Sequence, residues 1–223
     1  MFFQRIEYGV FSAEQNMKID SENLQSAENS GESVFRTYGW DRKSVTVGHF
    51  QKIEKIIDIE LCEKYDIPIV RRPTGGKALL HCGDFTFSVV FGKKIQGCNI
   101  RDYYKIVNTA LNSALNDIGV SSAIKAEQAK NEINNPLCFN YISQYELVYG
   151  AVKIAGTAQR CLKNAVLVQG TLPLKTDYEL YDKIFKINEK KIILKNDRVI
   201  IDEELVIPHV LSERFFRQLS DII

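Results

Sequence analysis

Short strand-like runs, joined by tight turns and separated by longer helical patterns, are the feature that most constrains how this chain can fold. Residues 33–38, 44–47 and 84–91 are rich in β-branched and aromatic side chains, which is typical of strands. Residues 145–148 and 152–155 flank a glycine-containing turn and predict a hairpin. Hairpins interrupted by helices are typical of an α+β protein. We therefore expect an α+β fold with a mixed, largely antiparallel sheet packed with helices.

Two segments carry strong helix signals. Ser12 is followed three residues later by Gln15, the order of a capping box, which predicts a helix from there to about Asn29. Apolar residues fall three or four apart over residues 102–118, and Gly119 follows as a natural helix end. Weaker patterns predict one helix over 53–65, a helix near Tyr178, a small hairpin around Asn196 and Asp197, and a final helix from Ser212.

Composition bounds the class of protein. The 223 residues include 29 Lys plus Arg and 28 Asp plus Glu, and this formal net charge of +1 excludes a nucleic-acid partner recruited by bulk charge. The chain has no apolar run that could span a membrane and no secretory signal pattern. Five cysteines without a Cys-x-x-Cys pair argue against disulfides and structural zinc. We expect a protein of the reducing cytoplasm without a metal.

The length fits one domain over residues 1–223, in which residues 176–223 form a small C-terminal extension. Neither a coiled coil nor an exposed apolar stripe is evident in the sequence. We therefore expect a monomer.

The first segment that could carry chemistry is the loop over residues 71–81. Gly75 and Gly76 would let backbone amides approach a ligand closely, and Arg71, Arg72 and Lys77 supply positive charge. These residues predict a cradle for an anionic or acyl-carrying group. A tight loop with solvated basic residues fits the local chemistry equally well.

The second candidate is Lys153, which lies between apolar residues on a short predicted strand. Pointed into a site, it would be desolvated enough to act as a base or to assist a thiol. On the solvent-exposed face of the hairpin it would have no such role. Since lysines are seldom buried, residue type alone favours the solvent-exposed face.

The third candidate is Cys138, at the end of a polar, Asn-rich stretch over residues 121–137. Loops often carry reactive groups, and Lys153, fifteen positions later, could supply the positive charge that a thiolate needs. A packed free cysteine is the plainer interpretation. Cys82, beside His81, and Cys161 are the rival thiols.

Together these segments resemble the lipoate and biotin protein ligase superfamily, in particular the domain shared by lipoate-protein ligase A and the cysteine-dependent octanoyltransferases. The resemblance covers roughly residues 1–175 and implies a biotin/lipoate ligase catalytic-domain fold, similar to class II aminoacyl-tRNA synthetases. It implies catalytic roles for Cys138 and Lys153. Its matching stretches are residues 16–20, 38–40, 44–51, 71–81 and 153–159. The substrate contacts it implies are Arg71, Arg72, Gly75, Gly76, Lys77, Ala78, His81, Gly156, Thr157 and Ala158.

The resemblance implies one of two chemistries. Octanoyltransferases take the acyl group from acyl carrier protein onto a cysteine and pass it to a lysine of a lipoyl domain or a glycine-cleavage H-type protein, without a cofactor. Ligases use ATP and Mg to activate a free lipoate or biotin. Cys138 followed by Phe139, and Tyr145 followed by Glu146, resemble the octanoyltransferases. We expect the transferase or a related amidotransferase, with a ligase or a non-catalytic acyl-carrier-binding module as alternatives.

One motif departs from the pattern of this superfamily. In the segment 168–171, Gln169 stands before Gly170 where the resemblance would place a histidine. The loop also has Lys77 where many relatives keep a glycine or an arginine. These departures bear on which acyl group the chain would accept.

Overall fold

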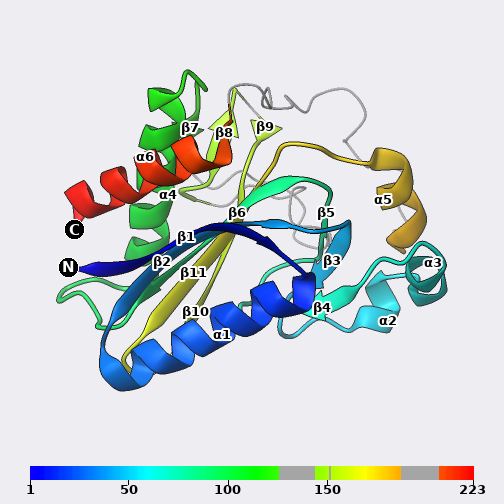
Figure 1. Ribbon diagram of the computed structural model, residues 1–223, viewed down its shortest axis with the longest axis horizontal. Helices are drawn as coiled ribbons and strands as arrows, with labels where there is room; N and C mark the ends of the chain where they lie inside the picture. The colour runs from blue at the N-terminus through cyan, green and yellow to red at the C-terminus, as the bar shows by residue number, and fades with distance from the viewer. Residues whose placement is uncertain (126–143, 151, 187–205) are drawn as a thin grey trace.

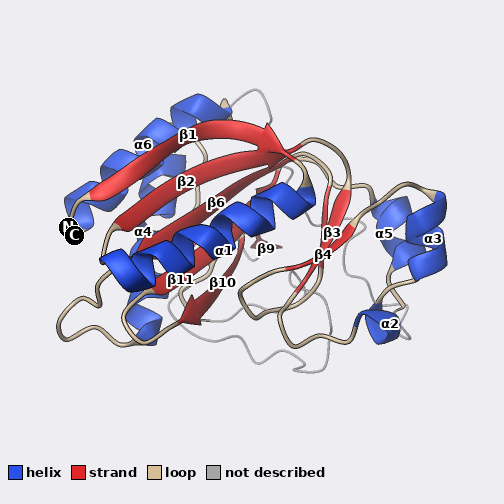
Figure 2. Cartoon of the chain, turned by 60° about the horizontal axis from the view of Figure 1, so that its bottom comes forward, coloured by secondary structure: helices blue, strands red, loops and turns tan. Residues whose placement is uncertain are grey.

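A twisted five-stranded sheet forms the centre of the protein (Figures 1 and 2). The computed structural model describes residues 1–125, 144–150, 152–186 and 206–223. In spatial order the sheet contains β1 (Phe3–Phe11), β2 (Ser33–Trp40), β6 (Asp84–Phe91), β11 (Val166–Pro173) and β10 (Gly156–Cys161). Only β1 and β2 run parallel in it, because the helix between them, α1 (Ala13–Ser30), returns the chain to the same edge.

Two smaller sheets flank the central one. The first consists of β4 (Ile69–Arg71), β3 (Ser44–Val47) and β5 (Leu79–His81), in that order. The second is antiparallel and consists of β7 (Ala123–Ile124), β8 (Leu147–Tyr149) and β9 (Val152–Lys153). The predicted α+β fold with a mixed, largely antiparallel sheet is confirmed, and so is the hairpin, which is β8 and β9.

Helices cover both faces of the central sheet (Figure 2). One face carries α1, and the other carries α4 (Ile100–Asp117) and α6 (Pro208–Ile222), which lie against each other. The main core between this second face and its helices is rich in fully buried aromatic rings, each of which stabilises the fold by roughly 1.5–3 kcal/mol. They are Phe35, Phe85, Phe87, Phe91 and Phe215.

Both strong helix predictions are confirmed, and their ends have local causes. The Ser12 hydroxyl accepts a hydrogen bond from the Gln15 backbone amide at 3.2 Å, and the Gln15 side-chain oxygen accepts one from the Ser12 backbone amide. Gly31 ends α1 with φ 77°, which favours glycine. In α4 the predicted apolar face is buried, and Gly119 follows the helix with φ 89°.

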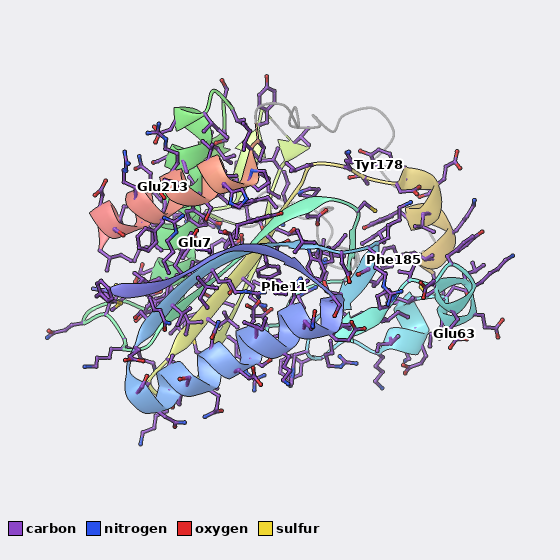
Figure 3. The ribbon with its side chains drawn as sticks, in the orientation of Figure 1. Glu7, Phe11, Glu63, Tyr178, Phe185 and Glu213 are labelled. Atoms are coloured by element: carbon purple, nitrogen blue, oxygen red, sulfur yellow. The ribbon has the colours of Figure 1, made fainter. Side chains whose placement is uncertain are left out.

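The sheet of β3, β4 and β5 packs with three short helices to form a second core. These are α2 (Ile53–Ile56), α3 (Ile59–Lys64) and α5 (Tyr178–Ile184). Figure 3 shows Tyr178 and Phe185 at the two ends of α5, beside α2 and α3. The single helix predicted over 53–65 is wrong, because Ile57 leaves the helical conformation to pair with Phe185, and Asp58 then caps α3.

The segment 176–223, expected to be a small extension, supplies a helix to each core. Leu211 and Phe215 of α6 lie in the main core, and Glu213 of the same helix forms an ion pair with Arg5 on β1 (Figure 3). The last helix begins at Pro208, four residues before the predicted start, because proline suits the first turn of a helix. The hairpin predicted around Asn196 lies outside the described residues.

Candidate functional site

A pocket with a cavity volume of about 40 Å³ lies where α1, the central sheet and the sheet of β3, β4 and β5 meet. Six residues that the sequence predicted as substrate contacts line it: Arg72, Gly76, His81, Gly156, Thr157 and Ala158. Arg71, Gly75, Lys77 and Ala78 belong to the same loop but are not on the pocket wall.

The rest of the wall was not predicted. It comes from α1, from β2 and β11, and from neighbouring strands: Met17, Tyr38, Trp40, Leu79, Thr86, Gln169, Gly170 and Thr171. Alternation along a strand brings Tyr38 and Trp40, and likewise Gln169 and Thr171, to one face. Polar residues within such buried strands are the sequence signal that could have found this wall.

Asp20, on the buried side of α1, organises one part of the wall. Its carboxylate accepts hydrogen bonds from Arg36 at 2.9 Å, Tyr38 at 2.7 Å, Ser88 at 2.7 Å and Gln169 at 2.6 Å. A carboxylate has about four acceptor positions, so this one is saturated. Burial, followed by the charge of Asp20, raises the pKa of Tyr38 well above its usual value, and the phenol therefore remains a donor.

Gln169, which stands where the resemblance would place a histidine, is held at both ends of its amide. Its Nε2 donates to Asp20, and its Oε1 accepts from the Thr74 hydroxyl at 2.8 Å. This second bond ties the loop over residues 71–81 to the central sheet. The amide of Gln169 therefore helps to hold the pocket wall in place.

His81 is also fully engaged. Its Nδ1 lies 2.7 Å from Asp84 Oδ2, its Nε2 lies 2.9 Å from Thr46 Oγ1, and its ring stacks on Trp40 at 3.9 Å between centroids. Because the Asp84 carboxylate accepts, its contact places a proton on His81 Nδ1, and the Thr46 oxygen also accepts a bond from Arg72. His81 therefore presents an aromatic face to the pocket.

Arg72 holds the loop together from inside. Its guanidinium donates to the Thr46 carbonyl and hydroxyl at 3.2 and 2.8 Å, and to the carbonyls of Gly75 and Lys77 at 3.1 and 2.9 Å. The residue is 6% exposed. A group buried in this way is not presented to a docking protein, and Arg72 braces the loop from inside.

Arg71 is exposed and braces the neighbouring loop. Its Nη1 donates to the carbonyls of Gly48, His49 and Gln51 at 2.8 to 2.9 Å. The loop over residues 48–51 and the diglycine loop are thus held against each other, with the His49 amide donating to the Thr74 carbonyl.

Gly48 is required by this contact. A Cβ at Gly48 would lie 2.0 Å from the Gly76 carbonyl oxygen, and Gly76 has φ 90°, so that neither backbone can easily yield. We expect Gly48→Ala to lower stability by about 1–3 kcal/mol, measured by urea unfolding. Gly75→Ala is the matched control, since its Cβ would meet nothing within 4 Å. Equal stability of the two variants would contradict this account of the loop.

Lys153 is buried, so the solvent-exposed position that residue type alone favoured is wrong. Its Nζ lies 2.6 Å from Glu146 Oε1, and the two residues are 5% and 4% exposed. Tyr104 donates to the same oxygen at 3.0 Å. The amine is therefore desolvated, as expected of a lysine that points into a site, and a carboxylate faces it.

The predicted nucleophile, Cys138, lies outside the described residues. Its rivals can be judged, since burial raises the pKa of Cys82 to about 11 and also raises that of Cys161. Burial and then the charge of Asp58 raise the pKa of Cys62 to about 11. Nucleophilic attack requires the thiolate, which is scarce in these residues at neutral pH.

These thiols should therefore resist alkylation. At pH 8 about one Cys82 or Cys62 side chain in a thousand is the thiolate, and the rate of modification by iodoacetamide should rise about tenfold per pH unit up to pH 10. Peptide mass spectrometry would follow each site, with urea-unfolded protein as the control in which all sites react. Rapid labelling of folded Cys82 at pH 8 would restore it as a rival nucleophile.

Neither a metal site nor a membrane segment is visible in the part of the chain that the structure describes. No group of three or more His, Cys, Asp or Glu side chains there is placed to hold a metal ion. No described helix combines the length and the apolar character needed to cross a membrane.

Solved structures of known proteins share this fold. A lipoate-protein ligase A bound with ATP superposes with a TM-score of 0.77 at 22% identity, covering 100% of this chain and 85% of that one. A bi-partite lipoate protein ligase from Thermoplasma acidophilum, described with its E2 lipoyl domain, gives a TM-score of 0.73 at 22% identity, covering 98% and 84%. The expected lipoate-ligase type of catalytic-domain fold is confirmed.

Sequence relatives give more specific information on function than the shared fold does. The Carboxydothermus hydrogenoformans octanoyltransferase LipM is 35% identical over 198 residues, which is 87% of this chain and 72% of the relative. The Bacillus subtilis octanoyltransferase LipM is 28% identical over 94% of this chain and 78% of its own length. The family model described as the lipoyl protein ligase A/B catalytic domain matches residues 12–207. By these matches, this chain belongs to the lipoyl protein ligase A/B catalytic-domain family and is an acyltransferase.

Proposed function

We propose that this chain transfers an octanoyl group from acyl carrier protein, through a Cys138 thioester, to a lysine of a lipoyl domain. The relatives named octanoyltransferase support octanoyl transfer in lipoylation. The observation that carries the proposal is the pocket, whose polar wall groups on Tyr38, Gln169 and His81 are bonded to other protein groups. Such a wall offers a ligand mainly apolar surface, which suits an alkyl chain.

The first step forms the acyl-enzyme. The Cys138 thiolate, favoured by the positive charge of Lys153, attacks the thioester carbonyl of octanoyl-acyl carrier protein. A new carbon–sulfur bond forms, and the carrier's phosphopantetheine leaves as a thiolate that takes up a proton. Backbone amides near Gly76 or Thr157 stabilise the oxyanion of the tetrahedral intermediate.

The second step forms the amide. The neutral ε-amine of the acceptor lysine attacks the Cys138 thioester, loses a proton, and expels the Cys138 thiolate. A lipoyl domain is the proposed acceptor, as the related archaeal ligase is described with one, and a glycine-cleavage H-type protein is chemically equivalent. Because the thioester is already activated, this route uses no nucleotide and no metal.

The carrier would dock where the loops meet at the pocket. Arg71 is exposed there and fits an acidic carrier surface with its phosphopantetheine, whereas the Lys77 Nζ atom is buried. Reaction with acyl carrier protein and lipoyl domains would place the protein in the cytoplasm. We also propose that it acts as a monomer.

Intact-mass spectrometry after incubation with octanoyl-acyl carrier protein, without ATP, tests the proposal. The expected result is a gain of one octanoyl group, which disappears when a lipoyl domain is added and reappears on that domain. Absence of the adduct, together with transfer from free octanoate only when ATP and Mg are present, would make the chain a ligase. Binding of the carrier without any labelling would make it a non-catalytic module.

A further inference from the structure

Glu146 is a buried carboxylate to which the proposed mechanism gives no role. One of its oxygens, Oε1, accepts both the Lys153 ammonium at 2.6 Å and the Tyr104 hydroxyl at 3.0 Å. Glu146 directly precedes β8 and Lys153 is on β9, whereas Tyr104 comes from α4. Two side chains from separate parts of the chain thus converge on one oxygen atom of Glu146.

Stability alone is a poor explanation for this ion pair. Burying both charges costs solvation energy that their attraction only partly returns, so a pair of packed apolar residues at these positions would be about as stable. Lysine also has a long, flexible side chain that can adopt many rotamers. A carboxylate that holds its ammonium in one place removes that freedom before any substrate arrives.

The backbone beside Glu146 is held just as firmly. Tyr145 has φ 67°, a conformation unfavourable for a tyrosine, and strained residues of this kind occur often at functional sites. Asn108 of α4 donates to the Tyr145 carbonyl at 3.0 Å and accepts the Thr157 hydroxyl at 2.9 Å. Tyr104 and Asn108, one helical turn apart, therefore connect the carboxylate to Thr157 on the pocket wall.

We propose that Glu146 is a positioning residue for Lys153 and that Tyr104 positions Glu146. This inference rests on the proposed function, in which the Lys153 charge serves the Cys138 thiolate. The carboxylate holds the ammonium in one orientation, and the Tyr104 hydroxyl fixes the carboxylate by donating to the same oxygen. Neither Glu146 nor Tyr104 contacts the acyl group in this arrangement, and both act through the lysine.

Single-turnover acylation by octanoyl-acyl carrier protein, followed by intact mass, tests the proposal in Glu146→Gln and Tyr104→Phe. We expect the maximal rate to fall roughly 10- to 100-fold for Glu146→Gln and roughly 3- to 10-fold for Tyr104→Phe. The donor concentration at half-maximal rate should not change, since donor binding is not affected. Thermal unfolding of each variant establishes that it is folded at the assay temperature.

Tyr103→Phe is the matched control. This neighbour on α4 also loses one hydrogen bond, the one its oxygen accepts from the Ile95 amide at 2.6 Å, and no hydrogen bond joins it to Glu146 in the described part of the chain. Its acylation rate should equal that of the unaltered protein. Tyr104→Phe carries the test if Glu146→Gln does not fold, because it removes only one hydroxyl group.

A second comparison uses Lys153→Met. If Glu146 acts through the lysine, adding Glu146→Gln to Lys153→Met should slow acylation no further. A further loss in the double variant, or rates for Glu146→Gln and Tyr104→Phe equal to that of Tyr103→Phe, would overturn the assignment of Glu146. The proposed function fails separately, when the unaltered protein is not acylated, and the role of Glu146 then falls with it.

Discussion

Cys138→Ser is expected to gain no octanoyl mass and to lose transfer to a lipoyl domain by at least about 10³-fold. A serine hydroxyl is hardly ionised at neutral pH, and the Lys153 charge that favours a thiolate cannot make it a comparable nucleophile. The measurement is intact mass after incubation with octanoyl-acyl carrier protein, followed by single-turnover transfer. This is the largest effect on activity that we predict for one substitution.

Cys82→Ser and Cys161→Ser are the controls for this loss. Burial raises the pKa of both thiols, so neither should carry the acyl group, and both variants should be labelled like the unaltered protein. An octanoyl adduct that persists in Cys138→Ser and disappears in Cys82→Ser would move the nucleophile to Cys82.

Asp20→Asn is expected to have the largest effect on stability, a loss of about 3–5 kcal/mol. The change leaves the guanidinium of Arg36, which is 1% exposed, without its charge partner, and places amide protons against the hydroxyl of Tyr38 and the amide of Gln169. Tm should fall by roughly 10 °C for a domain of this size. Calorimetry and urea unfolding would measure both quantities.

Asp66→Asn is the matched control for this prediction. Asp66 also pairs with an arginine, Arg42, but its side chain is 85% exposed, and such ion pairs contribute little. Asparagine also tolerates the φ of 52° at this position. We expect a change within about 0.5 kcal/mol. A similar loss in both variants would mean that the buried network around Asp20 has no special role in stability.

Helix ends and helix faces could be read from local sequence because their causes are local. The capping box at Ser12 and Gln15 uses atoms three residues apart, and the buried face of α4 follows from 3.6 residues per turn. The break between α2 and α3 could not be read, because Ile57 leaves the helix to pair with Phe185, which is distant in sequence. Strand β10 was missed because its register depends on β11.

The candidate site likewise contains residues that the sequence could predict and residues that it could not. Short motifs placed Gly76, His81 and Thr157 in it, since glycine-rich loops and the resemblance are visible along the chain. Nothing in a polar helix indicates that Asp20 collects donors from three strands. A lysine on a two-residue strand likewise gives no sign of which face it occupies.

By itself, then, the sequence determined the α+β class, the two long helices, the glycine-rich loop and the resemblance to lipoate and biotin ligases, all of which depend on neighbouring residues or short motifs. Tertiary structure decided that Arg72 braces the loop from inside and that Lys153 is buried against Glu146. The physical reason is that burial and charge pairing depend on which distant segments meet, and only the packing of α1, α4 and the sheets brings those segments together.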